Sequence, residues 1–202
     1  MPFKPHINSA AISQLFTEAR TQNGWLLDTV SDTVPEATLR ELHRLASLAP
    51  TSMNCQPMRL VFLTTPAAKA RLLPTLMAGN VDKARQAPVT VIVAYDTQFF
   101  ELLPQIWHGA GARDMFADDV PLATITATRN GTLGGGYVIL AARALGLDIG
   151  PMSGFDNAKV DAEFFPDGRY KSNFLCSLGV GDASLVMPRN ARLSFEQACQ
   201  VL

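Results

Sequence analysis

An excess of charge of either sign is missing from this chain. Its 202 residues include 17 Lys and Arg against 18 Asp and Glu, a formal net charge of −1. Without surplus cations there is no electrostatic footprint for phosphates of DNA or RNA, so we expect no nucleic-acid partner. Charged residues make up only 17% of the chain, below the share of about 25% that is typical of soluble domains. This shortfall indicates additional buried surface and favours an oligomer.

Cysteines and long apolar runs are also scarce. Cys55, Cys176 and Cys199 are too few and too scattered for a disulfide framework or a zinc site, so we expect no metal. The first residues lack the apolar core of a signal peptide, and the longest uncharged stretch, residues 45–58, contains two prolines. These absences predict a cytoplasmic protein without a membrane partner.

Two common nucleotide-binding motifs are absent as well. No GxGxxG follows a strand pattern and no GxxxxGK[ST] occurs, which argues against a Rossmann or P-loop domain. A Cys–His nucleophile built on Cys55 has no diagnostic spacing to any of the three histidines, and a lone Cys is more often packed than reactive. A hydrolase using Cys55 stays open as a minor alternative.

The sequence does contain helical and strand patterns in alternation. Residues 88–95 are almost continuously apolar and β-branched, which predicts a strand buried on both faces. Apolar residues at helical spacing predict a long helix over 122–145, with Gly146 as its C-terminal stop. Further helices are expected over residues 8–22, 35–48, 67–77 and 194–202, and further strands over 59–64 and 173–179. The fold class is α+β, in a single domain over residues 1–202.

Three consecutive glycines, Gly134-Gly135-Gly136, lie inside the long predicted helix. Each glycine costs about 1 kcal/mol relative to alanine in a helix interior. Close packing against a neighbouring element is the favoured explanation, and close approach of a flat ligand is the alternative.

Polar, glycine-rich or proline-bounded segments are spread along the chain, and each places cationic or amide side chains in a loop. Together they offer guanidinium groups for a phosphate, hydroxyls, and amides suited to a heteroaromatic ring. Their order reads Arg20-Thr21-x-Asn23, Ala49-Pro50-Thr51-Ser52-x-Asn54-x-Gln56-Pro57-x-Arg59, Asn80-x-x-Lys83, Gly150-Pro151-Met152-Ser153-Gly154-Phe155 and Arg192-Leu193-Ser194. In this combination the chain resembles the nitroreductase family of FMN-dependent oxidoreductases, over roughly residues 9–202.

The resemblance implies an α+β sandwich with a central mixed sheet flanked by helices, working as an intertwined homodimer with FMN at the subunit interface. Within the family, the segments Asn23-Gly24-Trp25, 150–156 and 171–182 resemble the malonic semialdehyde reductase subgroup associated with pyrimidine degradation.

The resemblance also implies roles for individual residues. The FMN phosphate and ribityl region would meet Arg20, Thr21 and Asn23, with Arg189 and Arg192 as further phosphate cations. The flavin of the other subunit would contact Pro50, Thr51, Ser52 and Asn54. The pyrimidine edge of the ring would face Asn80 and Lys83, and the N5 edge would lie under Pro151, Met152, Ser153 and Gly154, with backbone N–H groups of Ser153 and Gly154 near N5. Many family members have a glutamate at the position of Ser153 and a basic residue at that of Asn23.

The activity implied is ping-pong hydride transfer from NADH or NADPH through flavin N5 to a small acceptor, with malonic semialdehyde reduced to 3-hydroxypropionate as the leading hypothesis. A broad nitroaromatic or quinone reductase and a non-catalytic flavin-binding protein are the alternatives. For the carboxylate of an aldehyde substrate, Arg59 and Arg129 are candidate ligands, although a surface or dimer salt bridge is the favoured explanation for each.

Overall fold

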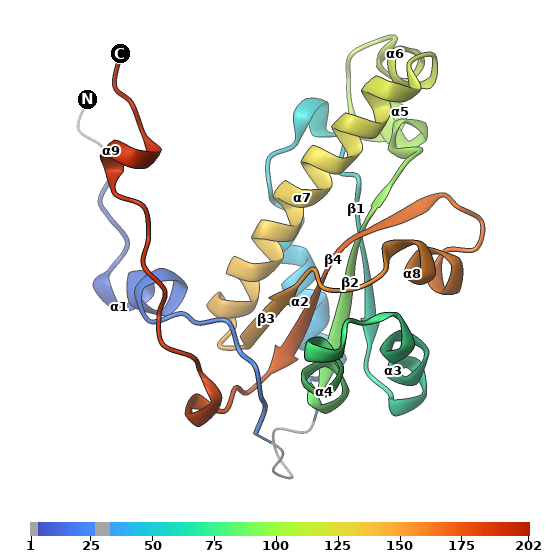
Figure 1. Cartoon of the computed structure of the whole chain (residues 1–202). Helices are drawn as coiled ribbons and strands as arrows, with labels where there is room; N and C mark the ends of the chain where they lie inside the picture. Colours follow the sequence, from blue (N-terminus) through green and yellow to red (C-terminus); the bar gives the residue numbers. More distant parts are fainter. Residues whose placement is uncertain (1–3, 27–32) are drawn as a thin grey trace.

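The protein is described from a computed structural model that covers residues 4–26 and 33–202 (Figure 1). Its centre is a four-stranded sheet in the order β1-β2-β4-β3. The strands are β1 (Met58–Leu63), β2 (Val89–Asp96), β3 (Asp148–Met152) and β4 (Tyr170–Gly179). We expected a mixed sheet, but the pairings between these strands are all antiparallel, and the parallel pairing is confined to an isolated bridge between Thr21 and Ile149.

Helices cover both faces of this sheet. Their bounds are α1 (Ser9–Ile12), α2 (Glu36–Ala46), α3 (Pro66–Leu72), α4 (Ala78–Gln86), α5 (Leu103–Ile106), α6 (Ala112–Ala117), α7 (Val120–Ala144), α8 (Asn157–Phe164) and α9 (Phe195–Ala198). A π-helical turn, Ser13–Thr17, follows α1, and short 3-10 turns occupy Ser52–Asn54, Leu73–Thr75, Phe99–Leu102 and Ala183–Leu185. No helix in the described ranges is long and apolar enough to cross a membrane.

The central strand β2 is buried on both faces, as its composition predicts. Val89, Val91 and Val93 pack with α2 and α7 in one core cluster. Ile92 and Ala94 face the other way and pack in a second cluster under α3 and α8. This alternation follows from the two-residue period of a strand, and it makes three layers, which Figure 1 shows edge-on.

The long helix α7 lies close to the sheet because of its glycines. A side-chain carbon built at Gly131 would lie 2.9 Å from Cβ of Tyr95, and one at Gly134 would lie 3.2 Å from Cβ of Met58. Glycine at these positions lets the helix backbone approach the strands, which supports the packing explanation. The helix ends as expected, since Gly146 has φ of 76° and its N–H donates to the carbonyl of Arg143.

Some predicted elements are shorter than expected, and others were not predicted. The helix expected over residues 8–22 ends at Thr17, and the one expected over 194–202 covers only Phe195–Ala198. Elements α4, α5, α6, α8 and β3 had no prediction. In α4 the dipeptide Gly79-Asn80 suggested a loop, and β3 contains Gly150-Pro151, which is compatible with a strand only because β3 is at the sheet edge.

Candidate functional site

A pocket of about 380 Å³ gathers the residues expected to hold a phosphate. Arginine side chains from three parts of the chain line it, together with Thr21 and Asn23, and no Asp or Glu does. The arginines are Arg20, Arg143, Arg189 and Arg192. Four guanidinium groups around one hollow, without a carboxylate, are suited to a multiply charged anion.

Two segments far apart in the sequence are joined by hydrogen bonds at this pocket. The guanidinium of Arg20 donates to the carbonyl of Met187, and that of Arg189 donates to the carbonyls of Thr17 and Ala19, at 2.8 and 3.1 Å. In Figure 1 the chain leaves β4 and runs alongside α1 as an extended segment, residues 180–202, which we call the C-terminal arm. These backbone contacts hold the arm's arginines beside Arg20 and Thr21.

Arg143 is a pocket residue that the sequence did not single out. It lies in the last turn of α7, where a basic residue is ordinary because it complements the helix dipole. One of its terminal nitrogens donates to the carbonyl of Leu15 at 2.9 Å, whereas its Nε is buried without a partner among the described residues. Burial of the guanidinium, and then repulsion by Arg189, lower the pKa of Arg143. An anion in the pocket would offset both effects, because its negative charge favours the charged guanidinium.

Strand β3 connects this pocket to a second group of predicted residues. The amide of Gln22 donates to the carbonyl of Ile149 at 3.1 Å, so the segment carrying Arg20 and Thr21 is fastened to the start of β3. From Ile149 to Ser153 the chain advances about 13 Å at the usual rise of a strand.

At the far end of β3, Gly154 and Asn80 are in direct contact. The Asn80 side-chain amide donates to the carbonyl of Gly154 at 2.8 Å, and the backbone amide of Met77 donates to the same oxygen at 3.0 Å. A side-chain carbon at position 154 would lie 2.5 Å from Nδ2 of Asn80, so only glycine permits this approach. Two segments predicted to address the same ring are therefore side by side.

Lys83 lies three residues further along α4. Its backbone carbonyl accepts a hydrogen bond from the indole Nε1 of the buried Trp25 at 2.9 Å. Lys83 is half-buried, and its ammonium group has no hydrogen-bond or ion-pair partner within residues 4–26 and 33–202. It is available to a ligand.

An apolar hollow of about 340 Å³ lies beside the Asn80–Gly154 contact. One wall is α7, through Thr132, Gly136 and Ile139, and the other is β3 with its following residue. The β3 side is lined by the predicted residues Pro151, Met152 and Ser153. Nothing lies within 4 Å of where a side chain at Gly136 would start, so this glycine leaves open space.

The segment from Pro50 to Gln56 lies elsewhere on the molecule, against the other side of α7. The backbone amide of Ser52 donates to Oδ1 of Asn130 at 2.8 Å, and Thr51 Oγ1 accepts from the amide of Gln56 at 3.2 Å. The Asn54 amide donates to the carbonyl of Ile106 at 2.9 Å. Among the described residues, the cavity that Thr51 and Gln56 line shares no residue with the pocket of Arg20, Arg143, Arg189 and Arg192, which we call the arginine pocket. It shares none with the hollow beside the Asn80–Gly154 contact either.

Of the two candidate ligands for a substrate carboxylate, Arg59 is already engaged. It forms an ion pair of 2.7 Å with the buried Asp96, which is the structural alternative considered for it. Arg129 is exposed on α7 and has no ion pair among the residues that the structure describes.

Cys55, the candidate nucleophile of the minor alternative, is buried at 1% exposure. Burial raises the pKa of its thiol to about 11. A nucleophilic cysteine needs a lowered pKa and a base nearby, and Cys55 contacts no histidine among its hydrogen-bond partners, which are Thr51 and backbone groups.

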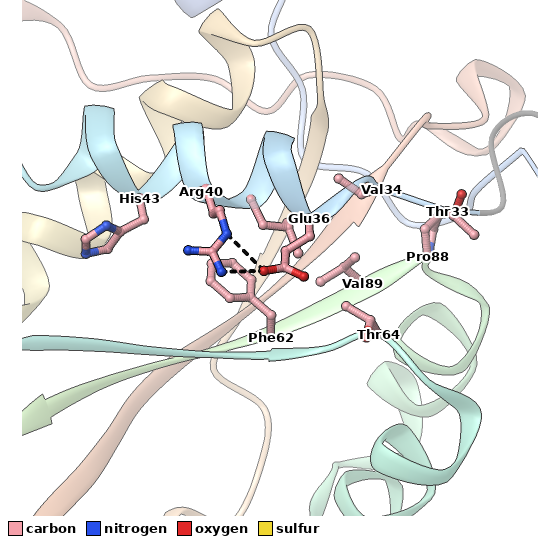
Figure 2. Close-up of a pocket in the computed structure, with 10 residues that line it drawn as sticks. Thr33, Val34, Glu36, Arg40, His43, Phe62, Thr64, Pro88 and Val89 are labelled. Atoms are coloured by element: carbon pink, nitrogen blue, oxygen red, sulfur yellow. Dashed lines mark hydrogen bonds and ion pairs between the residues drawn. The ribbon is translucent and has the colours of Figure 1, made fainter.

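A larger cavity, of about 800 Å³, opens between α2 and strands β1 and β2 (Figure 2). Its floor is apolar, with Leu39, Phe62 and Val89, and at its rim Glu36 and Arg40 neutralise each other. None of the predicted site residues lines it. Size alone does not make it the functional site, because its charged lining residues pair with each other and leave Thr33, His43 and Thr64 as its other polar groups.

Comparison with known proteins gives consistent results. A protein of Rhodopseudomonas palustris that is provisionally named an NADH dehydrogenase/NAD(P)H nitroreductase is 54% identical over 198 residues, covering 98% of this chain and 96% of its own length. A similarly named protein of Ralstonia nicotianae is 52% identical, covering 98% of this chain and 100% of its own.

Solved structures agree in fold. That of a provisionally assigned nitroreductase from Bacillus subtilis has a TM-score of 0.82 at 21% identity, over 96% of this chain and 100% of the other. One from Exiguobacterium sibiricum, described as in complex with FMN, has a TM-score of 0.80 at 18% identity, over 98% and 100%. The model of the nitroreductase family matches residues 30–181, and the chain belongs to the nitroreductase family.

Proposed function

We propose that this protein is an FMN-dependent NAD(P)H oxidoreductase, with one FMN-binding domain per chain. The observation that carries the proposal is the arginine pocket without carboxylates, joined by β3 to the Asn80–Gly154 contact. The names of the relatives, which include NAD(P)H, support the same reductant here.

The residues present fit the group they would hold. Arg20, Arg189 and Arg192, with Arg143 in addition, line one pocket and would supply charge-assisted hydrogen bonds to a phosphate dianion. Thr21 and Asn23 line the same pocket and would meet the phosphate and ribityl oxygens. The unpartnered Nε of Arg143 is a buried donor that such an anion would satisfy.

The second group of residues would hold the ring. Asn80 and Lys83 would face its pyrimidine edge, where the lysine ammonium would favour negative charge on the ring. Pro151, Met152, Ser153 and Gly154 would cover the N5 edge, with the backbone N–H groups of Ser153 and Gly154 toward N5. When bound, FMN supplies hydride exchange at N5, and the protein supplies binding, orientation and electrostatics.

We propose a homodimer in which Pro50, Thr51, Ser52 and Asn54 of one copy contact the flavin of the other. Large apolar side chains are exposed on α7 and on the C-terminal arm, and a second copy would cover them. They include Val120, Ile125, Leu133, Leu193, Phe195 and Val201. The separation of the Pro50–Gln56 segment from the arginine pocket within one copy supports this arrangement.

For the acceptor we propose malonic semialdehyde, reduced to 3-hydroxypropionate, on the likeness of residues 150–156 and 171–182 to that subgroup. Arg129 is the remaining candidate for the substrate carboxylate, since Arg59 is paired with Asp96. A broad nitroaromatic or quinone reductase is the second candidate, favoured by the nitroreductase names of the relatives.

Steady-state turnover with purified protein tests the proposal. The protein should be yellow, release FMN on denaturation, and oxidise NADH or NADPH in the presence of malonic semialdehyde. Double-reciprocal plots of initial rate, with one substrate varied at several fixed concentrations of the other, should give parallel lines. Faster turnover with nitroaromatics or quinones would select the second candidate. A protein that holds FMN but turns over no acceptor would be a flavin-binding protein, and one that cannot take up FMN would contradict the site itself.

A further inference from the structure

The segment from Thr51 to Gln56 is held in an unusual backbone conformation. Met53 and Asn54 both have φ of 51°, and Gln56 has φ of 39°. Within the described residues these are the non-glycine residues with positive φ, and all three lie in this one segment. Each such residue costs free energy and persists only where surrounding contacts fix it.

At one end, the segment is fixed by α7 and α5. The amide of Ser52 donates to Oδ1 of Asn130 at 2.8 Å, and the Asn54 side chain donates to the carbonyl of Ile106 at 2.9 Å. These contacts restrain Ser52 and Asn54 but leave the carbonyl of Gln56, at the other end, to another partner.

That partner is Arg59. Its NH1 donates to the carbonyl of Gln56 at 3.0 Å and to that of Met58 at 2.9 Å. Its NH2 donates to Oδ2 of Asp96 at 2.7 Å. One guanidinium therefore joins the positive-φ segment to the end of β2.

Asp96 is a rigid anchor for this guanidinium. Its side chain has 0% exposure, and its two oxygens also accept from Nε and NH2 of Arg169, at 3.0 and 2.9 Å, and from the amide of Gln98 at 2.9 Å. The ring of Tyr170 lies 5.7 Å from the Arg59 guanidinium carbon and 5.8 Å from that of Arg169. Buried charges in such a network are costly to unpair, so Arg59 has little freedom to move.

We propose that Arg59, anchored by Asp96, is a positioning residue that fixes the Thr51–Gln56 segment for contact with the cofactor of the second copy. The inference rests on the proposed function, in which this segment meets the flavin. Arg169 shares the carboxylate of Asp96 but makes no hydrogen bond to the segment. Replacing Arg169 therefore removes a partner of Asp96 alone, whereas replacing Arg59 also removes the hydrogen bond to the segment.

A thiol-labelling experiment tests the first half of the proposal without any cofactor. Cys55 lies inside the segment and is buried, Cys176 is buried in β4, and Cys199 is exposed. In a Cys199→Ser background, DTNB should label Cys55 about tenfold faster in Arg59→Gln than in the parent, since a lost charged hydrogen bond is worth about a factor of ten or more. Arg169→Gln should change the rate less than about twofold, because its loss leaves the contact to Gln56 intact. Equal rates in the two variants would overturn the proposal.

The second half needs the holoenzyme. Arg59→Gln should raise the KM for the acceptor or the Kd for FMN about tenfold, and shift the visible circular dichroism of the flavin, while Arg169→Gln leaves these values near those of the parent. Arg59→Lys keeps the charge facing Asp96 and should restore part of the loss; it also replaces Arg59→Gln if that variant folds poorly. Unchanged KM, Kd and flavin spectrum in Arg59→Gln would overturn this half. Parent protein that takes up no FMN would overturn the proposed function and this half with it, whereas the thiol rates still decide whether Arg59 holds the segment.

Discussion

The arginine pocket places four positively charged side chains close together. Four guanidinium groups line one hollow with no acidic side chain, and repulsion from Arg189 contributes to the lowered pKa of Arg143. Such an arrangement is stable only if each cation has carbonyls, water or an anion to contact. Arg20, Arg143 and Arg189 do donate to carbonyls, but these bonds use one terminal nitrogen of each guanidinium and leave its other N–H donors for a ligand.

We expect Arg20→Ala and Lys83→Ala each to weaken FMN retention by about 1–3 kcal/mol, the usual value of a hydrogen bond to a charged group. Fluorescence titration of apoprotein with FMN measures this directly. Arg71→Ala is the matched control, because Arg71 pairs with Glu163 on the exposed surface, away from the pocket. Parent-like affinity in both site variants would remove these residues from the cofactor site.

Cys55 carries a prediction about pH. Burial raises the pKa of its thiol to about 11 from an ordinary value of 9.0. The folded state therefore keeps a proton that the unfolded state releases, so this contribution to stability is complete below about pH 9 and is lost as the pH rises toward 11. In urea titrations across this range, Cys55→Ala should show a shallower alkaline loss of unfolding free energy than the parent, together with retained turnover. A large loss of turnover would favour the Cys55 hydrolase.

At the scale of elements, the glycines of α7 differ in their surroundings: some pack against the sheet and one faces open space. A methyl group at Gly131 would meet Cβ of Tyr95 at 2.9 Å, whereas one at Gly136 would meet nothing within 4 Å. Gly131→Ala should therefore destabilise the fold by about 1–3 kcal/mol. Gly136→Ala should stabilise it by up to about 1 kcal/mol through helix propensity. Denaturant unfolding of the two variants makes the comparison, and destabilisation by both would mean that α7 tolerates no added methyl group on either side.

Elements with a long, consistent pattern could be predicted from the sequence, and those with short or conflicting patterns could not. β2 and α7 fall in the first group, because continuous burial and a sustained helical period leave one solution. β3 is in the second, since Pro151 is acceptable only through its edge position. Near the start of α4, the side chain of Asn80 donates to the carbonyl of Gly154. Because these two residues are far apart in the sequence, the stabilising contact leaves no local pattern.

The candidate site shows the same division. The family motifs led to Arg20, Thr21, Asn23, Arg189 and Arg192, which line one pocket. Arg143 was missed because a basic residue in a last helical turn has an ordinary explanation, and only the fold brings it to Arg189. For Arg59 the sequence favoured a salt bridge, which the structure confirms, but it could not identify the partner, because Asp96 lies 37 positions along the chain and on the neighbouring strand.

At the scale of the whole molecule, the low charge content finds a structural counterpart. The C-terminal arm exposes Leu193, Phe195, Val201 and Leu202, and it touches the rest of the chain near the arginine pocket. An extended arm with large exposed apolar side chains is suited to a surface that a single chain does not provide. The arginines of the same arm line the pocket, so arm position and anion binding are expected to be coupled.

We therefore expect Phe195→Asp and Val201→Asp to convert a dimer into monomer in sedimentation velocity and to lower FMN content together. Ala158→Asp, which adds the same charge at an exposed position of α8, should do neither. Conversely, FMN at a hundredfold excess over its Kd should raise the apparent unfolding free energy of the parent by about 2.7 kcal/mol, with a smaller gain in the arm variants because their affinity is lower. A parent that sediments as a monomer yet binds FMN fully would show that one copy completes the site, and the contact assigned to Pro50–Asn54 across the interface would then be wrong.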